Sequence, residues 1–332
     1  MSLGRALPQC SVCGERAIYI DRASGRAYCR RHFVERFEAR AKENIRRHGM
    51  LGKRERIAVG VSGGKDSLAL LYFLWKLSKR NPGWEVVAIV VDEGIAGYRE
   101  RTIENFKRVN ARLGVPYRVV SFKESFGYTL DEIIRMSSER GLGVLPCAYC
   151  GVFRRYLLNR AAREMGATVL AIAHNADDMA QTFLMNLGSA TLERLARLGP
   201  VSGVASHEKF VRRIRPFYNI PEKEVALYAL LHDLIEPEYN QCPYVVYNVR
   251  HKIRGMLNRL EDDFPGFKAS LVRSFERLLP VLRERFAPRG EIGTCKICGE
   301  PSSHDVCRAC TYRLQLGILD SGLLRFHVPA KT

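Results

Sequence analysis

The sequence lacks any long apolar run. Its most apolar helical stretch, residues 68–77, has about half the length that a membrane-spanning helix needs. The first residues lead directly to Cys10 without the apolar core and cleavage site of a signal peptide. We therefore expect a cytoplasmic protein with no membrane partner.

Acidic residues are also scarce. The chain of 332 residues has 35 Asp and Glu against 53 Lys and Arg, which gives a formal net charge of +18. Such a field attracts polyanions and says little about the fold. Nucleic acid is the leading partner on this ground, and a basic surface without a specific ligand is the alternative.

The chain contains ten cysteines. In a cytoplasmic chain they are expected to be metal ligands or catalysts rather than disulfides. Two sets of four metal-binding residues, one near each end of the chain, each combine two closely spaced pairs: Cys10, Cys13, Cys29 and His32, and Cys295, Cys298, Cys307 and Cys310. This spacing is typical of closed structural zinc sites with no position for substrate, so we predict two bound Zn²⁺.

Short β-branched runs alternate with longer helical stretches from residue 54 onward. Strands are expected at residues 57–61, 86–91, 117–122 and 168–173, and helices at 33–48, 67–79, 99–113, 130–138, 152–165 and 176–187. This alternation predicts a doubly wound parallel α/β sheet with helices on both faces. Beyond Pro221 the pattern becomes mainly helical, at 222–232, 249–260 and 265–286.

Four regions follow from these patterns. We expect a zinc knuckle with a basic helix in residues 1–50 and a catalytic domain in 51–220. A helical region in 221–290 and a second zinc knuckle in 291–332 complete the chain.

The first predicted strand runs into the segment Ser62-Gly63-Gly64-Lys65-Asp66-Ser67 and then an apolar helix. Such a junction builds an anion site, because glycines let the backbone approach closely and the helix dipole adds partial positive charge. The spacing does not fit a Walker A loop. It resembles the PP-loop of the N-type ATP pyrophosphatases, which cleave ATP between the α and β phosphates. An ordinary glycine turn is the alternative.

Two further segments, residues 146–155 and 173–178, together with residues 94–98 and 242–244, are similar to signatures of the tRNA 2-thiouridine synthetases within that superfamily. The resemblance covers nearly the full length and includes both predicted zinc knuckles. It implies an adenine-nucleotide α-hydrolase type of sheet. It also implies an activity in which ATP adenylates the C2 carbonyl of a tRNA uridine, sulfur replaces the oxygen, and AMP and pyrophosphate are released.

The resemblance also implies roles for single residues. The residues implied to hold ATP are Ser62, Gly63, Gly64, Lys65, Asp66, Ser67, His174 and Asp177. Asp66 is expected to act through Mg²⁺, with Lys65 neutralising charge beside it, and Asp178 is the expected catalytic carboxylate. A helix-entry cap formed by Asn175 is the alternative for the His174-Asn175 segment, and capping is compatible with catalysis.

Cys147, Cys150 and Cys242 remain outside the zinc sets. Three cysteines on a four-iron cluster leave the fourth iron open for a terminal sulfide, so family resemblance favours a [4Fe-4S] cluster. A cysteine persulfide resolved by a second thiol is the runner-up, and a zinc site completed by His or Asp ranks third. Arg154 stands where the T-loop branch of the family has lysine. Because arginine does not lose its proton, its expected role is electrostatic.

Contacts with tRNA are expected from basic residues that track the phosphate backbone: Arg46, Arg47, Arg212, Arg213 and Arg215. Whether the wobble uridine at position 34 or the T-loop uridine at position 54 is modified is left open. The sulfur donor is either a ubiquitin-like protein with a thiocarboxylate end or simple sulfide, and a homodimer is expected from the resemblance. Two other classes compete: a nucleic-acid-binding scaffold without catalysis, and a PP-loop synthetase acting on a small metabolite.

Overall fold

A central sheet organises the computed structural model, which describes residues 8–202, 207–235, 241–286 and 292–319. Six strands form it: β3 (Glu55–Val61), β4 (Trp84–Asp92), β5 (Tyr117–Ser121), β6 (Val169–Ala171), β7 (Val201–Ser202) and β8 (Arg212–Ile214). Their order is β5-β4-β3-β6-β8-β7. All neighbours pair in parallel except β7, which runs antiparallel to β8 at one edge. The predicted parallel sheet is therefore confirmed, with one antiparallel edge strand added.

Helices cover both faces of this sheet. In β3, Ile57 and Val59 pack in a core shared with α2 and α3, whereas Ala58 packs on the opposite face with Ala161 and Ala162 of α6. This alternation is the two-residue period of a strand that is buried on both sides. The doubly wound arrangement predicted from the sequence is confirmed.

The helices follow the predicted order. They are α1 (Arg30–Arg47), α2 (Lys65–Ser78), α3 (Arg99–Leu113), α4 (Phe122–Phe126), α5 (Leu130–Glu139), α6 (Pro146–Glu164), α7 (Ala176–Gly188), α8 (Leu192–Ala196), α9 (Glu222–Leu231), α10 (Val249–Asp263), α11 (Phe267–Phe286) and α12 (Arg308–Gln315), with a short 3-10 helix η1 (Pro243–Tyr247). Helix α6 begins six residues before the predicted start, at Pro146, because proline is well suited to the first helical position. This places Cys147 and Cys150 in the first turn of a helix.

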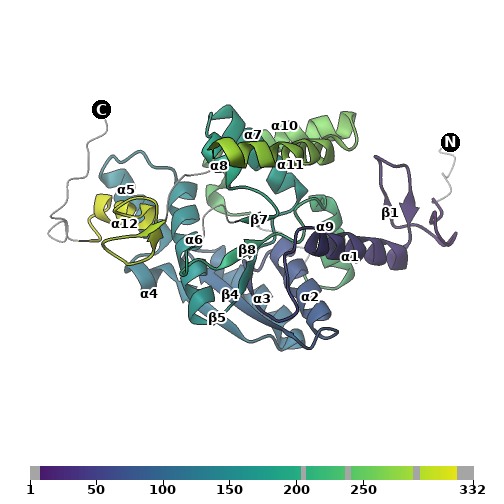
Figure 1. Ribbon diagram of the computed structural model, residues 1–332, viewed down its shortest axis with the longest axis horizontal. Helices are drawn as coiled ribbons and strands as arrows, with labels where there is room; N and C mark the ends of the chain where they lie inside the picture. Colours follow the sequence, from purple (N-terminus) through teal and green to yellow (C-terminus); the bar gives the residue numbers. More distant parts are fainter. Residues whose placement is uncertain (1–7, 203–206, 236–240, 287–291, 320–332) are drawn as a thin grey trace.

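Small modules lie at opposite ends of the long axis of the molecule (Figure 1). The hairpin of β1 (Tyr19–Ile20) and β2 (Ala27–Tyr28) precedes α1, and the hairpin of β9 (Gly293–Thr294) and β10 (Pro301–Ser302) precedes α12. The predicted span 291–332 of the second module includes residues 291 and 320–332, which lie outside the described residues. The boundaries of the four predicted regions stay predictions.

Helices α7, α8, α10 and α11 gather on one side of the carboxyl edge of the sheet (Figure 1). The rings of Phe183 in α7 and Phe275 in α11 lie 5.1 Å apart and form part of this packing. Within the described residues, no helix has the length and apolar character required to cross a bilayer.

A buried carboxylate joins the N-terminal module to the sheet domain. The Glu224 side chain in α9 is 2% exposed and accepts hydrogen bonds from Arg36 at 3.0 Å and Arg40 at 2.9 Å, both in α1. It also accepts a hydrogen bond from the Tyr19 hydroxyl at 3.0 Å. A buried charge of this kind is tolerated because its partners replace the lost hydration.

Glu224→Gln removes the charge and leaves the Arg40 guanidinium without its counter-ion, while Arg36 keeps its ion pair with Asp21 at 2.9 Å. We expect the free energy of unfolding, measured by urea denaturation, to fall by about 2–3 kcal/mol. Glu43→Gln is the matched control, because Glu43 pairs with Arg46 at the exposed surface of α1. The control should leave the denaturation midpoint unchanged, and an equal effect of both substitutions would contradict the assignment.

Candidate nucleotide and sulfur site

The predicted phosphate loop connects β3 to α2. Gly63 has a φ of +80°, and a Cβ at this position would lie 1.8 Å from the Thr102 carbonyl oxygen, so glycine is required. The Ser67 hydroxyl accepts a hydrogen bond from the Ser62 amide at 3.1 Å and donates one to the Gly64 carbonyl at 2.9 Å. These bonds fold the loop over the first turn of α2, where unpaired helix amides bind anions.

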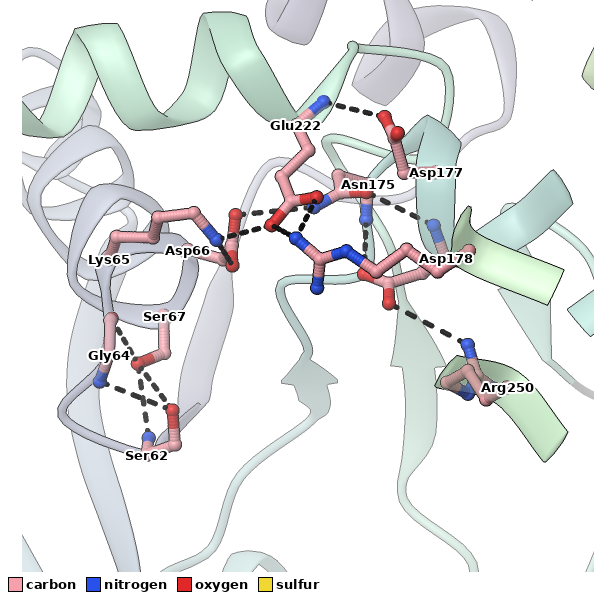
Figure 2. Close-up of polar contacts among 11 residues, drawn as sticks. Ser62, Gly64, Lys65, Asp66, Ser67, Asn175, Asp177, Asp178, Glu222 and Arg250 are labelled. Atoms are coloured by element: carbon pink, nitrogen blue, oxygen red, sulfur yellow. Dashed lines mark hydrogen bonds and ion pairs between the residues drawn. The ribbon is translucent and has the colours of Figure 1, made fainter. Parts of the chain in front are cut away.

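Charged side chains converge beside this loop (Figure 2). The Lys65 ammonium lies 2.8 Å from the Asp66 carboxylate and 2.7 Å from that of Glu222 in α9. Burial opposes the charge on Lys65, but the two carboxylates raise its pKa. Glu222 also pairs with Arg254 at 2.8 Å. Glu222 was not predicted as a site residue, because a single acidic residue after Pro221 has no distinctive spacing.

Asn175 caps α7 and also contacts the phosphate loop. Its side chain accepts a hydrogen bond from the Asp178 amide, and the Asp178 carboxylate accepts one from the Asn175 amide, both at 3.1 Å. The Asn175 side-chain amide donates to Asp66 at 3.2 Å. The helix-entry cap considered for this segment is therefore confirmed, and it places the Asp178 carboxylate beside the phosphate loop.

Asp178 has the electrostatic character expected of a functional carboxyl group. Burial and the nearby Asp66 carboxylate raise its pKa to about 6, although Arg250, at 3.7 Å, opposes this shift. Burial also raises the pKa of Asp66. Carboxylates held close together in this way suit the binding of a divalent cation, which favours their ionised form.

His174 and Asp177 have different surroundings. The Arg215 guanidinium donates to His174 Nδ1 at 3.3 Å, and loss of hydration together with nearby arginines lowers the pKa of His174. Asp177 is buried, accepts a hydrogen bond from the Glu222 amide at 2.8 Å and pairs with Lys268 of α11. Asp177 thus holds α9 and α11 in place beside the nucleotide site, and its contact with ATP stays a prediction.

Cys147, Cys150 and Cys242 come from α6 and from the residue preceding η1. The Cys147 thiol lies 3.8 Å from the Tyr244 carbonyl oxygen, which brings η1 against α6. The sulfurs of Cys147, Cys150 and Cys242 do not all lie within 4.8 Å of one another, unlike the ligand atoms within each of the two terminal sets. A single zinc ion with bonds of about 2.3 Å needs such close sulfurs, whereas a larger cluster needs more widely spaced ones. The three thiols therefore fit an iron–sulfur cluster better than zinc.

Arg154 links these cysteines to the phosphate loop through a chain of side chains. One of its nitrogens donates to Cys150 Sγ at 3.1 Å, and its Nε lies 2.7 Å from Glu93. Glu93 is 3% exposed and also pairs with Arg99 at 2.9 Å. Arg99 in turn donates to the Ser62 carbonyl of the phosphate loop. Glu93 and Arg99 were not predicted as site residues, because only their burial and pairing distinguish them.

The two terminal sets of metal-binding residues are closed. The ligand atoms within each set all lie within 4.8 Å of one another: Cys10, Cys13, Cys29 and His32, and Cys295, Cys298, Cys307 and Cys310. The sulfurs of Cys13 and Cys29 are 3.7 Å apart, and those of Cys298 and Cys307 are 3.6 Å apart. This spacing fits the tetrahedral coordination of one zinc ion in each set.

The five arginines predicted to contact tRNA lie in different environments. Arg46 is exposed and pairs with Glu43, and Arg47 lies 3.3 Å from Glu276. Arg212 donates to the backbone carbonyls of Gly49 and Met50 at 2.9 Å. Arg213 is half-buried and Arg215 is buried. Three of the five arginines are thus at the surface: Arg46, Arg47 and Arg212. The other two, Arg213 in β8 and Arg215 just after it, are less accessible.

Comparisons with known proteins place this site in a family. A PP-loop domain matches residues 33–259. The chain is 34% identical to the tRNA 2-thiolation protein NcsA of Haloferax volcanii, over 91% of this chain and 97% of that protein. It is 35% identical to the tRNA-5-methyluridine(54) 2-sulfurtransferase of Pyrococcus horikoshii, over 92% of this chain and 93% of that protein.

A solved structure agrees with these relatives. The U34-tRNA thiolase NcsA from Methanococcus maripaludis, determined with its [4Fe-4S] cluster, matches with a TM-score of 0.80 and 38% identity. The match covers 94% of this chain and 97% of that one. A phosphate loop and three cysteines at one edge of the sheet are in keeping with this similarity. The chain belongs to the PP-loop family of tRNA 2-thiolation sulfurtransferases.

Proposed function

We propose that this chain is a cytoplasmic, ATP-dependent tRNA uridine 2-sulfurtransferase. The observation that carries the proposal is the chain of contacts from Cys150 through Arg154, Glu93 and Arg99 to Ser62. It joins the two parts that thiolation requires, a nucleotide loop and a set of thiols. The names of the relatives supply the substrate class, tRNA. A further relative at 34% identity over 91% of this chain, the cytoplasmic tRNA 2-thiolation protein 1 of Aspergillus niger, supplies the cytoplasmic location.

The nucleotide side of the site activates the uridine. The amides at the start of α2 bind the ATP phosphates, and Lys65 exchanges its carboxylate partners for phosphate oxygens. Asp66 and Asp178 would hold Mg²⁺, which would supply positive charge for the leaving pyrophosphate. Adenylation at the C2 oxygen turns a poor leaving group into AMP.

Sulfur is delivered from the cysteine side. Cys147, Cys150 and Cys242 would hold a [4Fe-4S] cluster. With three cysteine ligands, such a cluster would leave one iron available to sulfide. Arg154 keeps positive charge beside the Cys150 sulfur, and Glu93 fixes the orientation of its guanidinium. Sulfide or a thiocarboxylate protein would supply sulfur at the oxidation level that the cluster route uses. The alternative, a cysteine persulfide, would instead require a donor that already carries sulfane sulfur. The two terminal modules hold structural Zn²⁺, and a homodimer stays a prediction.

The direct test is nucleoside mass spectrometry of tRNA from cells with and without the gene. We expect one 2-thiouridine derivative to disappear when the gene is deleted, with its position mapped to uridine 34 or uridine 54. Pyrophosphate release by the purified protein should require added tRNA. Release without tRNA, combined with unchanged nucleosides, would instead identify a synthetase acting on a small metabolite.

Replacing Cys147, Cys150 or Cys242 by serine should remove iron. Protein purified without oxygen should contain about four iron and four sulfide per chain, and each variant should lose both together with thiolation. Zinc content and ATP binding should be unchanged. Cys13→Ser is the reciprocal control, because Cys13 lies in the N-terminal module: it should lose one zinc and keep the iron. Full thiolation by iron-free protein would support the persulfide alternative.

The Asp178 carboxyl group makes the proposed nucleotide chemistry sensitive to pH. The carboxylate of Asp178, with its pKa of about 6, becomes protonated as the pH falls below that value. We therefore expect tRNA-dependent pyrophosphate release at limiting Mg²⁺ to decline below about pH 6, because protons then compete with the cation for this carboxylate. Asp178→Asn keeps the capping geometry, and it should lower the rate by about 100-fold or more and abolish this acid limb.

Circular dichroism across the same pH range controls for unfolding. An acid limb that persists in the Asp178→Asn variant would assign the titration to another group.

A further inference from the structure

Arginine side chains line the space between α6 and β8. Asn159 fixes these two elements against each other: its side-chain amide donates to the Lys209 carbonyl at 2.8 Å, and its side-chain oxygen accepts from the Val211 amide at 3.0 Å. Helix α6 precedes β6, which pairs in parallel with β8, so the helix runs antiparallel to both strands. The start of the helix therefore points toward the carboxyl edge of the sheet, where the nucleotide site lies.

Arg155 and Arg213 are brought together by this register. Arg155 lies one helical turn before Asn159, a step of about 6 Å toward the carboxyl edge. Arg213 lies two residues after Val211, a step of about 6.6 Å in the same direction. The backbone positions of the two arginines thus lie at about the same level between helix and strand. The Arg155 guanidinium extends toward the start of α6, where it lies beside Gly151, and it is close enough to Arg213 to act on its charge.

Arg215 continues the row on the same face of the chain. It is buried, donates to the Gly199 carbonyl at 2.5 Å and contacts His174 at 3.3 Å. His174 immediately precedes Asn175, the cap of α7 that contacts Asp66. The row of arginines therefore leads from the flank of α6 directly to the nucleotide site.

In the part of the chain that the structure describes, no carboxylate pairs with these positive charges. Among the described residues, neither Arg155 nor Arg213 makes an ion pair, whereas the adjacent Arg154 pairs with Glu93. Burial and the neighbouring Arg155 lower the pKa of Arg213 to about 10, and burial and Arg213 lower that of Arg215 to about 10. Both shifts show that the charged forms are disfavoured here. An anion bound among them would relieve this cost.

We propose that Arg155, Arg213 and Arg215 form a phosphate-binding cleft that holds one phosphodiester of the RNA strand carrying the reacting uridine. The choice of RNA rests on the proposed function. Guanidinium groups bind phosphate oxygens through paired hydrogen bonds, and three of them surround a single phosphate.

The position of the cleft favours RNA over the phosphates of ATP. The ATP phosphates bind at the start of α2, which follows β3, whereas the cleft lies two strands away along β8. Arg155 also follows Arg154, which contacts Cys150, on the same helix. A strand anchored here presents its neighbouring base between the thiols and the nucleotide loop. Because Arg215 is buried, only an extended, unpaired segment reaches it, as in recognition of single-stranded loops.

The test measures binding of an unmodified tRNA transcript to the full chain, without ATP or sulfide, over a range of salt concentrations. Arg155→Met and Arg213→Met should each weaken binding several-fold and reduce the slope of log affinity against log salt by about 0.7–0.9, the value for one phosphate contact. Arg54→Met is the matched control, because Arg54 is exposed near the amino end of β3, at the opposite edge of the sheet. The control should keep the wild-type slope.

Arg215 is left intact because its bond to Gly199 supports the fold, and thermal unfolding confirms that the variants remain folded. The KM for ATP, measured by pyrophosphate release, distinguishes the two phosphate sources. A raised KM for ATP with an unchanged salt slope would show that the cleft holds nucleotide phosphate and would overturn the assignment to RNA.

If Arg155→Met and Arg213→Met have the same salt slope and the same KM for ATP as the Arg54→Met control, these arginines bind no phosphate and the proposal is wrong. Because binding is measured without turnover, normal tRNA binding by a protein that leaves tRNA nucleosides unmodified would reject the proposed function while the cleft stands.

Discussion

The side chain of Asn175 is the contact on which the site depends. Its oxygen caps α7 and its nitrogen binds Asp66, so one amide joins the helix that follows β6 to the helix that follows β3. Adjacent parallel strands end at the same edge of a sheet, but their loops are otherwise independent. Through Asn175, the position of Asp178 relative to the phosphate loop is determined by hydrogen bonds rather than by loop length.

Charge is divided across this edge. On the side of the phosphate loop, Lys65 and Arg254 neutralise Asp66 and Glu222, so an incoming nucleotide would exchange partners with groups that are already paired. On the far side, Arg213 and Arg215 gather without counter-ions among the described residues. The ion pairs beside the phosphate loop stabilise buried charges before any ligand binds. The arginines without counter-ions would instead be stabilised by an anionic ligand.

Features with a local pattern could be predicted from the sequence. The glycine-rich loop, the paired cysteines and the Asn175 cap each follow from spacing within a few residues, and the structure shows them in the expected places. Glu93 and Glu222 could not be predicted, because each becomes distinctive only when a distant arginine or lysine pairs with it. Strand β8 was missed for a related reason: two of its three residues are arginines, and only pairing with β6 makes the segment extended.

The C-terminal module with its four cysteines packs against the helix that carries Cys147 and Cys150. Tyr312 of α12 packs its ring 4.7 Å from that of Tyr149, which lies between Cys147 and Cys150 in the first turn of α6. Cys307 and Cys310, two of the four residues that could hold a metal ion in this module, lie at the start of α12. Oxidation of these thiols to a disulfide would therefore displace Tyr312 and loosen the turn that spaces Cys147 and Cys150. The chain could lose sulfur transfer to an oxidant that never reaches the cluster itself.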